Sequence, residues 1–404
     1  MLSYGLISKA ARPSRAAFRG CPDGSRFRGM MSSAQLIIAD SEKNANLYYA
    51  TRFLAPDSFI FVQLNGTKVL VMSDLEIDRA KSQAKVNEVL SYAKLSQQAK
   101  RRLNQEPTML DVVDELLKGH AVTALEVPLD FSIAYADGLR TRGYTVDPKP
   151  EPFYPQRMIK TEEEIEMLIH TLRATEEALE SAIELIRNSE IKPDGTLWIG
   201  GRPLTAEMIR KVMHMQLMER ECVGQHTIIA CGIQAVDPHN EGSGSLKAHE
   251  PIVMDVFPQH ATTRYFADIT RTVVKGQASE KVRRMFEAVK EGQEIAFRRI
   301  RDGADGSAIH QDIMSSFDAL DFKTGEQGGR MQGFFHGTGH GVGLEIHEPP
   351  RISARKDLLK TGMVVTVEPG LYYADAGGMR IEDMVVVTPD GCRLLTQAPK
   401  ILEV

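Results

Sequence analysis

Five side chains of the types that bind divalent cations lie in the last 150 residues of the chain. They are Asp255, Asp268, His340, Glu368 and Glu382, and each lies in a segment typical of a strand or the end of a strand. Four carboxylates and one imidazole offset the charge of two divalent cations and still allow a bridging hydroxide. The set therefore predicts a dinuclear metal site. One imidazole among oxygen ligands points to Mn²⁺, our first expectation, or to Co²⁺, Zn²⁺ or Fe²⁺, rather than to Ca²⁺.

The four carboxylates form two pairs that repeat one sequence pattern. Asp255 and Asp268 are 13 positions apart, Glu368 and Glu382 are 14 apart, and both pairs read as apolar strand, acid, turn, acid and strand. Two hairpins built alike could face each other across a pseudo-two-fold axis and deliver four oxygen ligands to one cavity. For a single buried acid such as Asp255, the alternative is an ion pair with a nearby arginine. The repetition over four acids favours the metal site.

Further candidates surround the histidine of the set. His340 lies in the glycine-rich segment GTGHGVG, where glycines let the backbone approach a crowded centre. His347 and His239 are candidate catalysts rather than ligands, and a surface or capping role is the alternative for each. Arg351 could bind a substrate carboxylate through two parallel hydrogen bonds, or form an ordinary salt bridge. The surface or capping interpretation is favoured for four other histidines, His120, His170, His214 and His310.

The elements that must position these residues fall into two groups. Residues 32–150 mix short apolar strands with helical stretches, which predicts an α/β domain. Four prolines between positions 148 and 155 then indicate a linker. Thr161 and Glu164 have the spacing of a capping box, which predicts a helix from there to about Arg187. Two more amphipathic helices are predicted over 280–301 and 307–320, with strands between and after them, so residues 157–404 form a second domain.

Composition and charge narrow the class of protein. A formal net charge of −5 without a basic stripe argues against nucleic-acid binding. No apolar run approaches the roughly 18 residues of a membrane span, so we expect no membrane protein. Four scattered cysteines indicate a reducing compartment, and we expect a cytoplasmic protein. Residues 1–31 carry six Lys and Arg against one acid, so they form either a disordered tail or a targeting segment for the mitochondrial matrix.

The segments DVF…ADITRT, GTGHGVGLEIHEPPR, VEPGLYY and GGMRIED resemble the signature blocks of the M24 metallopeptidases. This family includes methionine aminopeptidases, aminopeptidase P, prolidases and the metal-free creatinase. The resemblance covers residues 157–404 and implies an α+β catalytic domain of the pita-bread fold. The α/β domain before it is similar to the N-terminal domain of prolidase, aminopeptidase P and creatinase. The resemblance also implies a homodimer.

The same resemblance assigns roles to the candidate residues. It makes the four acids and His340 of the predicted site the metal ligands, with Glu368 as the expected proton shuttle. His239 and His347 would contact the substrate and stabilise the tetrahedral intermediate. Arg351 would hold a proline carboxylate. Arg271 and Arg380 would orient ligand carboxylates from behind.

We therefore expect an exopeptidase that hydrolyses Xaa-Pro bonds in small peptides. An Xaa-Pro dipeptidase (prolidase) is the first prediction and an Xaa-Pro aminopeptidase (aminopeptidase P) the alternative. A non-catalytic pita-bread binding protein is a remote alternative, because such a protein would have lost ligands. The chain departs from the family in one place: the first two aspartates are usually 11 apart, and Phe257 replaces a glycine. Two extra residues would lengthen the hairpin without turning Asp268 away, because side chains alternate with a period of two.

Overall fold

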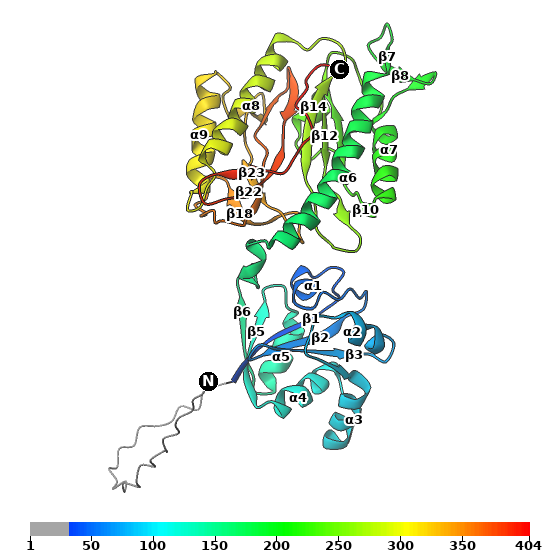
Figure 1. Ribbon diagram of the computed structural model, residues 1–404, viewed down its shortest axis with the longest axis vertical. Coiled ribbons are helices and arrows are strands. Elements are labelled where there is room, and N and C mark those ends of the chain that lie inside the picture. The colour runs from blue at the N-terminus through cyan, green and yellow to red at the C-terminus, as the bar shows by residue number, and fades with distance from the viewer. Residues whose placement is uncertain (1–31) are drawn as a thin grey trace, which may run out of the picture.

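The computed structural model describes residues 32–404 of the chain (Figure 1). Residues 1–31, for which the sequence predicts a tail or a targeting segment, lie outside the described residues. The elements up to Lys149 form one sheet with its helices, an α/β arrangement, and the elements from Pro155 onward form a second, larger group (Figure 1). No helix between residues 32 and 404 is long and apolar enough to cross a membrane.

The N-terminal sheet has six strands in the order β4-β3-β2-β1-β5-β6. Its strands are β1 (Ser32–Ala39), β2 (Phe59–Leu64), β3 (Thr67–Met72), β4 (Glu88–Ser91), β5 (Val122–Pro128) and β6 (Thr145–Lys149). β1 runs antiparallel to β2 and parallel to β5, and β5 runs parallel to β6. The helices are α1 (Ala45–Thr51), α2 (Ile77–Gln83), α3 (Tyr92–Leu103), α4 (Met109–Gly119) and α5 (Ile133–Thr141).

Helices cover both faces of this sheet because its strands alternate two apolar sets. In β1, Leu36 packs in the same cluster as Val112 and Leu116 of α4, whereas Ile37 packs with Leu47 of α1 on the other side. The first of the prolines that predict a linker lies at the edge of the sheet, and the other three follow it. Pro148 lies within β6, the edge strand, where a missing backbone donor is tolerated.

In the C-terminal part, two helix pairs flank a layer of strands (Figure 1). The pairs are α6 (Glu162–Arg187) with α7 (Ala206–Glu219), and α8 (Glu280–Arg299) with α9 (Gly306–Ala319). Leu172 of α6 shares a core cluster with Met254 and Ile269, whereas Val289 of α8 packs in a second cluster with Val365. Each helix pair therefore supports one half of the strand layer.

The strands of that layer form two main sheets. The first is β11 (Ile228–Cys231), β12 (Pro251–Val256) and β14 (Ile269–Val274). The second, in sheet order, is β18 (Glu348–Ile352), β17 (Gly339–Gly341), β19 (Val364–Val367), β22 (Asp383–Val387) and β23 (Cys392–Leu394). A hairpin of β20 (Gly370–Tyr373) and β21 (Gly377–Arg380) connects β19 to β22.

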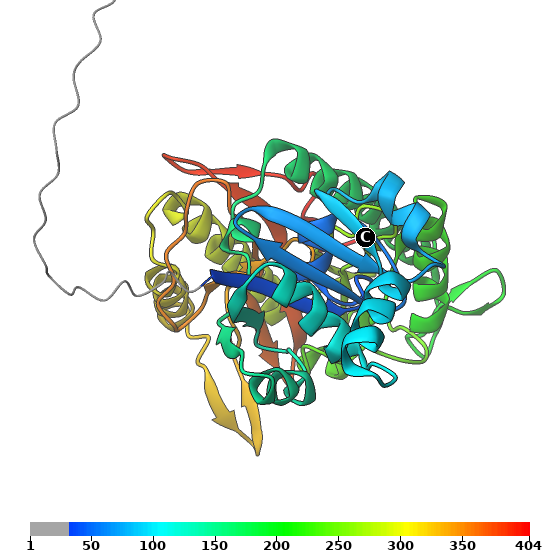
Figure 2. The same ribbon diagram turned by 90° about the horizontal axis from the view of Figure 1, so that it is seen from below.

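Shorter elements complete the chain. They are the 3₁₀ helices η1 (Pro155–Met158) and η2 (Gly232–Val236), and the strands β7 (Glu190–Ile191), β8 (Leu197–Ile199), β9 (Arg202–Pro203), β10 (Cys222–Val223), β13 (Gln259–His260), β15 (Gly325–Gln327) and β16 (Arg330–Gln332). Seen from below, the hairpin of β15 and β16 projects from the body of the molecule (Figure 2).

The predicted helices agree closely with the structure. Thr161 caps α6 and forms the capping box with Glu164, which confirms the predicted start, and the helix ends at Arg187 as predicted. The helix predicted over 280–301 ends at Arg299, because Ile300 already has extended backbone angles. The helix predicted over 307–320 runs over Gly306–Ala319.

Candidate metal centre and catalytic cavity

The five ligand-type side chains line one cavity of about 890 Å³ in the C-terminal part. Two come from the first sheet: Asp255 lies in β12 and Asp268 immediately before β14. Three come from the second sheet: His340 is the central residue of β17, Glu368 follows β19 and Glu382 precedes β22. The cavity therefore lies where the two sheets meet.

Strand register directs the two aspartates to the same side. Asp255 pairs with Thr270 in the β12–β14 ladder, and Asp268, two residues before Thr270, therefore lies on the same face. The bridge between Gln259 and Phe266 continues this register beyond β12. The two extra residues of this hairpin therefore lengthen both strands equally and leave Asp268 facing the cavity, as the period of two predicts.

The two glutamates are brought together in the same way. Val367 pairs with Asp383 in the β19–β22 ladder, so Glu368 and Glu382 are the next residues outward on the two strands. Thr270 donates a hydrogen bond to Glu382 Oε2 at 2.8 Å and so links this pair to the first sheet.

The ligand atoms are close together. Asp268, His340 and Glu382 each offer one atom in a group whose members all lie within 4.8 Å of one another. His340 Nε2 lies 3.5 Å from Asp268 Oδ2 and 3.4 Å from Glu368 Oε1. His340 Nδ1 lies 3.2 Å from the carbonyl oxygen of Gly341. We therefore place the proton on Nδ1, which leaves Nε2 free to bind a metal ion.

The residues present fit divalent cations because the cavity has too little positive charge of its own. Asp255 Oδ1, Asp268 Oδ1 and Glu382 Oε1 are buried and have no hydrogen-bond partner among the described residues. Buried carboxylate oxygens without a donor or a cation are costly, so such groups pair or coordinate metals. Three such oxygens in one cavity are the donor set that hard divalent cations require.

Burial shifts the pKa values of three of the acids and of His340. Burial raises the pKa of Asp268 well above its ordinary value, and the neighbouring carboxylates raise it further. Burial and the neighbouring carboxylates also raise the pKa of Glu382. Burial raises the pKa of Glu368 to about 8, although Arg380 opposes the change. Burial lowers the pKa of His340 to about 3, so the ring is neutral, as a metal ligand must be.

Arg380 is a buried cation that the protein itself supplies to this cavity. Its Nη2 donates to Asp255 Oδ2 at 2.6 Å, and its Nη1 donates to the Tyr372 hydroxyl at 2.7 Å. For Asp255 the sequence offered an arginine pair or a metal as alternatives, and the structure makes them compatible. One oxygen binds Arg380, and the other is left for a metal ion.

Two residues that the sequence analysis did not name belong to the same network. The Tyr372 hydroxyl lies 2.9 Å from His336 Nε2, and His336 Nδ1 lies 2.8 Å from the carbonyl oxygen of Gly337. Burial lowers the pKa of His336 to about 3, so the ring is neutral and its Nε2 accepts a hydrogen bond from the Tyr372 hydroxyl. Their positions were the available signal, since His336 lies four residues before His340 and Tyr372 four after Glu368.

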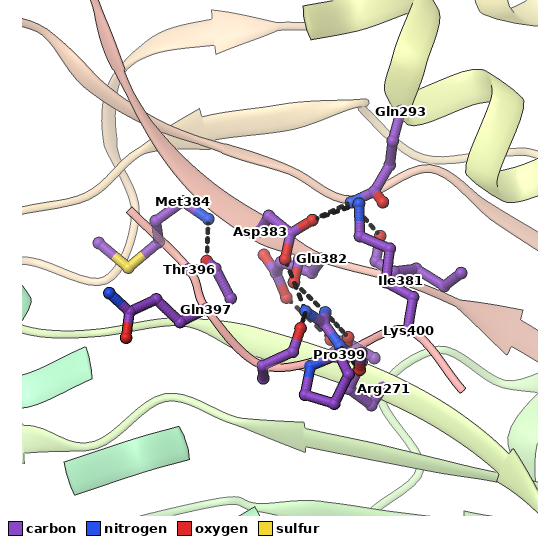
Figure 3. Close-up of polar contacts among 12 residues, drawn as sticks. Arg271, Gln293, Ile381, Glu382, Asp383, Met384, Thr396, Gln397, Pro399 and Lys400 are labelled. Atoms are coloured by element: carbon purple, nitrogen blue, oxygen red, sulfur yellow. Dashed lines mark hydrogen bonds and ion pairs between the residues drawn. The ribbon is translucent and has the colours of Figure 1, made fainter. Parts of the chain in front are cut away.

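Arg271 lies elsewhere than expected. It contacts no ligand carboxylate: its guanidinium pairs with Asp383 Oδ1 at 2.8 Å and donates to the main-chain carbonyl of Glu382 at 2.7 Å (Figure 3). Lys400 and Gln293 also contact the buried Asp383 (Figure 3). Arg271 points to the face of β14 opposite the cavity, so it supports the backbone that carries Glu382 rather than the carboxylate itself.

The remaining predicted residues form the rim of the cavity. His239, in the loop after η2, His347, just before β18, and Arg351, in β18, all line it and are all exposed. The ring of His347 packs edge-on against the ring of His340, with 4.4 Å between centroids. Arg351 pairs with His340 in the β17–β18 ladder. Its guanidinium forms no ion pair with a carboxylate in residues 32–404, and only its backbone amide bonds Asp357.

Comparisons with known proteins agree with this geometry. The family model of metallopeptidase family M24 matches residues 166–389, more than half of the chain. The chain belongs to metallopeptidase family M24. The Xaa-Pro dipeptidase of Pyrococcus furiosus is 29% identical over 366 residues, which cover 89% of this chain and 93% of that protein. The uncharacterized peptidase YqhT of Bacillus subtilis is 31% identical over 261 residues, which cover 63% of this chain and 67% of that protein.

Solved structures of M24 members confirm the fold. The prolidase from Pyrococcus furiosus superposes with a TM-score of 0.72 at 25% identity and covers 91% of this chain and 97% of that one. The X-Pro aminopeptidase from Thermotoga maritima superposes with a TM-score of 0.76 at 24% identity and covers 92% of this chain and 98% of that one. The C-terminal part is thus a pita-bread fold preceded by an α/β domain, and the chain is a metallopeptidase.

Proposed function

We propose that the protein is an Xaa-Pro dipeptidase that uses two divalent cations, with Mn²⁺ as the first candidate. The observation that carries the proposal is the set of three buried, unpartnered carboxylate oxygens in a cavity also lined by His340 and Glu368. The M24 relatives named Xaa-Pro dipeptidases support the substrate class.

The metal ions would be held by Asp255, Asp268, His340, Glu368 and Glu382. When bound, they would supply Lewis acidity, which polarises a carbonyl and makes water a better nucleophile at neutral pH. Arg380 would keep Asp255 in place by its 2.6 Å hydrogen bond to Oδ2. Groups that orient ligands in this way typically change metal affinity or activity 10- to 100-fold when they are removed, by an order-of-magnitude rule.

Hydrolysis adds a water oxygen to the scissile carbonyl and a proton to the leaving proline nitrogen. Glu368 is the proposed carrier of that proton, because its side chain is 19% exposed whereas those of Asp268 and His340 are 6% and 5% exposed. It can therefore reach the substrate side of the cavity. His239 and His347, at the rim, would donate to the developing oxyanion, and removal of one such donor costs about 10²–10³ in turnover.

Arg351 is the group that favours a dipeptidase over an aminopeptidase. Its guanidinium lies at the cavity, is exposed and has no carboxylate partner among residues 32–404, so it is available for the free carboxylate of an Xaa-Pro dipeptide. A longer peptide has no carboxylate at that position. The alternative, an Xaa-Pro aminopeptidase, would not depend on this charge.

The test compares a dipeptide such as Ala-Pro with the tripeptide Ala-Pro-Ala after the protein has been chelated and reloaded with Mn²⁺. Wild-type protein should prefer the dipeptide. Arg351→Met should raise KM for the dipeptide by about 10- to 100-fold, because a hydrogen bond to a charged group is worth about 1.5–3 kcal/mol. The tripeptide should be affected much less.

Arg355→Met is the matched control, because Arg355 is an exposed arginine four residues further on and does not line the cavity. It should behave as wild type on both substrates. If the wild type strongly prefers the tripeptide, the proposed activity changes from Xaa-Pro dipeptidase to Xaa-Pro aminopeptidase. Absence of metal binding under every loading condition would refute the enzyme mechanism. The expected homodimer is a separate proposal, which sedimentation of the intact chain would decide.

A further inference from the structure

A buried cluster of charges lies directly behind His347. The carboxylate of Glu348 accepts a hydrogen bond from Arg157 Nη2 at 2.9 Å and pairs with Lys160 Nζ. The side chains of these three residues are only 2–4% exposed. Gly343 leaves room for the carboxylate, since a Cβ there would lie 2.4 Å from Glu348 Oε1. The cluster is outside the metal-ligand set, and no step of the proposed reaction uses it.

This cluster joins three segments that are far apart in the sequence. Glu348 begins β18, Arg157 lies in η1 of the connection between the two parts of the chain, and Lys160 lies just before α6. Arg157 Nη1 also donates to Asn46 Oδ1 of α1 at 2.7 Å. The start of β18 is thereby fixed to the connection and, through Asn46, to the N-terminal sheet domain.

His347 lies on the other side of the same stretch of backbone. Consecutive residues at the start of a strand point to opposite sides, and here Glu348 points into the protein whereas His347 lines the cavity. Among residues 32–404 the His347 ring takes part in no side-chain hydrogen bond or ion pair, and it packs edge-on against His340. The position of the ring therefore depends on where Glu348 holds the backbone.

We propose that Glu348, held by Arg157 and Lys160, is a positioning residue that places His347 for the reaction. The proposal rests on the proposed function, in which His347 donates to the oxyanion. A second consequence is that the position of the N-terminal domain affects the position of His347, through the contacts from Asn46 to Arg157 and from Arg157 to Glu348. A displacement of about 1 Å in a catalytic group can reduce turnover about 100-fold, so a positioning residue has a large effect without touching substrate.

The principal test is a double-mutant cycle between Glu348→Gln and His347→Ala. Glu348→Gln keeps the size of the side chain and removes its charge. In the wild-type background it should lower kcat about 10- to 100-fold with little change in KM, by the same geometric argument. In the His347→Ala background it should change kcat less than about threefold, because the residue through which it acts is already gone.

Glu345→Gln is the matched control. Glu345 pairs with the same guanidinium, at 2.6 Å from Arg157 Nη2, and also lies within three residues of Glu348, but its side chain is 53% exposed. The Glu345 carboxylate is largely in solvent and Arg157 keeps its pair with Glu348, so the loss of this contact should leave kcat within about twofold of wild type. Equal losses from Glu348→Gln in both backgrounds would overturn the proposal, since a general structural defect acts without regard to His347.

Hydrogen exchange supplies a readout that needs no activity. Backbone amides of residues 344–350 should exchange faster in Glu348→Gln than in Glu345→Gln, while those of β19 and β22 should be unchanged. Unchanged exchange over 344–350 would overturn the proposal even for an active enzyme. If Glu348→Gln does not fold, Arg157→Lys takes its place in the same cycle and exchange measurement. An inactive wild type would refute the proposed function, whereas the exchange result would still decide the positioning role.

Discussion

Removal of the divalent cations should make the stability of this protein fall as the pH rises. In the chelated protein, the carboxylates of Asp255, Asp268, Glu368 and Glu382 face one cavity, in which Arg380 pairs with Asp255 and Arg351 lies at the rim. Protons are then the available substitute for the metal charge. The pKa values of three of these acids are raised, so these acids hold their protons to a higher pH than acids in water do.

Glu368 sets the size and the direction of the effect. Its pKa is 4.5 in an unfolded chain and about 8 in the folded one, so the folded state binds the proton more tightly. Stability from this group is therefore complete below about pH 4.5 and is lost as the pH rises toward 8. The loss is about 4 kcal/mol by pH 8, because each tenfold change in a protonation constant is worth about 1.36 kcal/mol. Burial raises the pKa values of Asp268 and Glu382 as well, so their contributions have the same sign.

Thermal unfolding of chelated and Mn²⁺-loaded protein between pH 5 and 8 measures the effect. A loss of about 4 kcal/mol should lower the Tm of a domain of this size by about 8–16 °C. The loaded protein should not show this fall, and calorimetry in buffers of different ionisation enthalpy should show that Mn²⁺ binding at pH 7 releases protons. Glu368→Gln should reduce the pH dependence of the chelated form. A Tm difference that is constant with pH, together with no proton release, would refute the reasoning.

Three further substitutions test the roles of groups in and around the cavity. Arg380→Met should lower metal affinity or kcat by about 10- to 100-fold, because Asp255 loses the donor that orients it; metal titration and turnover measure this, and unchanged values would contradict it. Arg271→Met leaves the buried Asp383 without its guanidinium partner and should destabilise the fold by about 3–5 kcal/mol, with kcat per folded molecule kept near wild type. Phe257→Ala should widen the cavity that Phe257 lines and raise kcat/KM for substrates with a bulky first residue, relative to Gly-Pro, by at least about 10-fold. An unchanged ratio over a panel of Xaa-Pro dipeptides would show that Phe257 does not set specificity.

That the five ligand-type side chains line one cavity could be predicted from the sequence, because their placement depends on local patterns. Asp255 lies within an apolar strand where an isolated charge is costly, and the alternation of strands fixes which face it shares with Asp268. The start of α6 was predictable for the same reason, since the Thr161–Glu164 capping box is contained in four residues. Such signals need no knowledge of distant segments.

The expectation for Arg271 failed although the sequence held the information. Arg271 follows Asp268 by three positions within one strand, and an odd separation places the two side chains on opposite faces. Arg380 could not be assigned by such counting, because it ends β21 while Glu382 precedes β22. Its contact with Asp255 spans 125 residues and depends on how the two sheets meet.

In two pairs of adjacent residues, one side chain faces the cavity and the next is held by ion pairs inside the protein. Glu382 faces the cavity with an unpartnered oxygen, whereas the next residue, Asp383, is fully paired with Arg271 and Lys400 (Figure 3). His347 faces the cavity, whereas the next residue, Glu348, is paired with Arg157 and Lys160. The alternation of a strand alone does not say which of its faces is the cavity. The partners of each buried carboxylate decide it: an acid whose two oxygens are both paired holds the strand in place, and an acid with a buried, unpartnered oxygen is available for a metal ion.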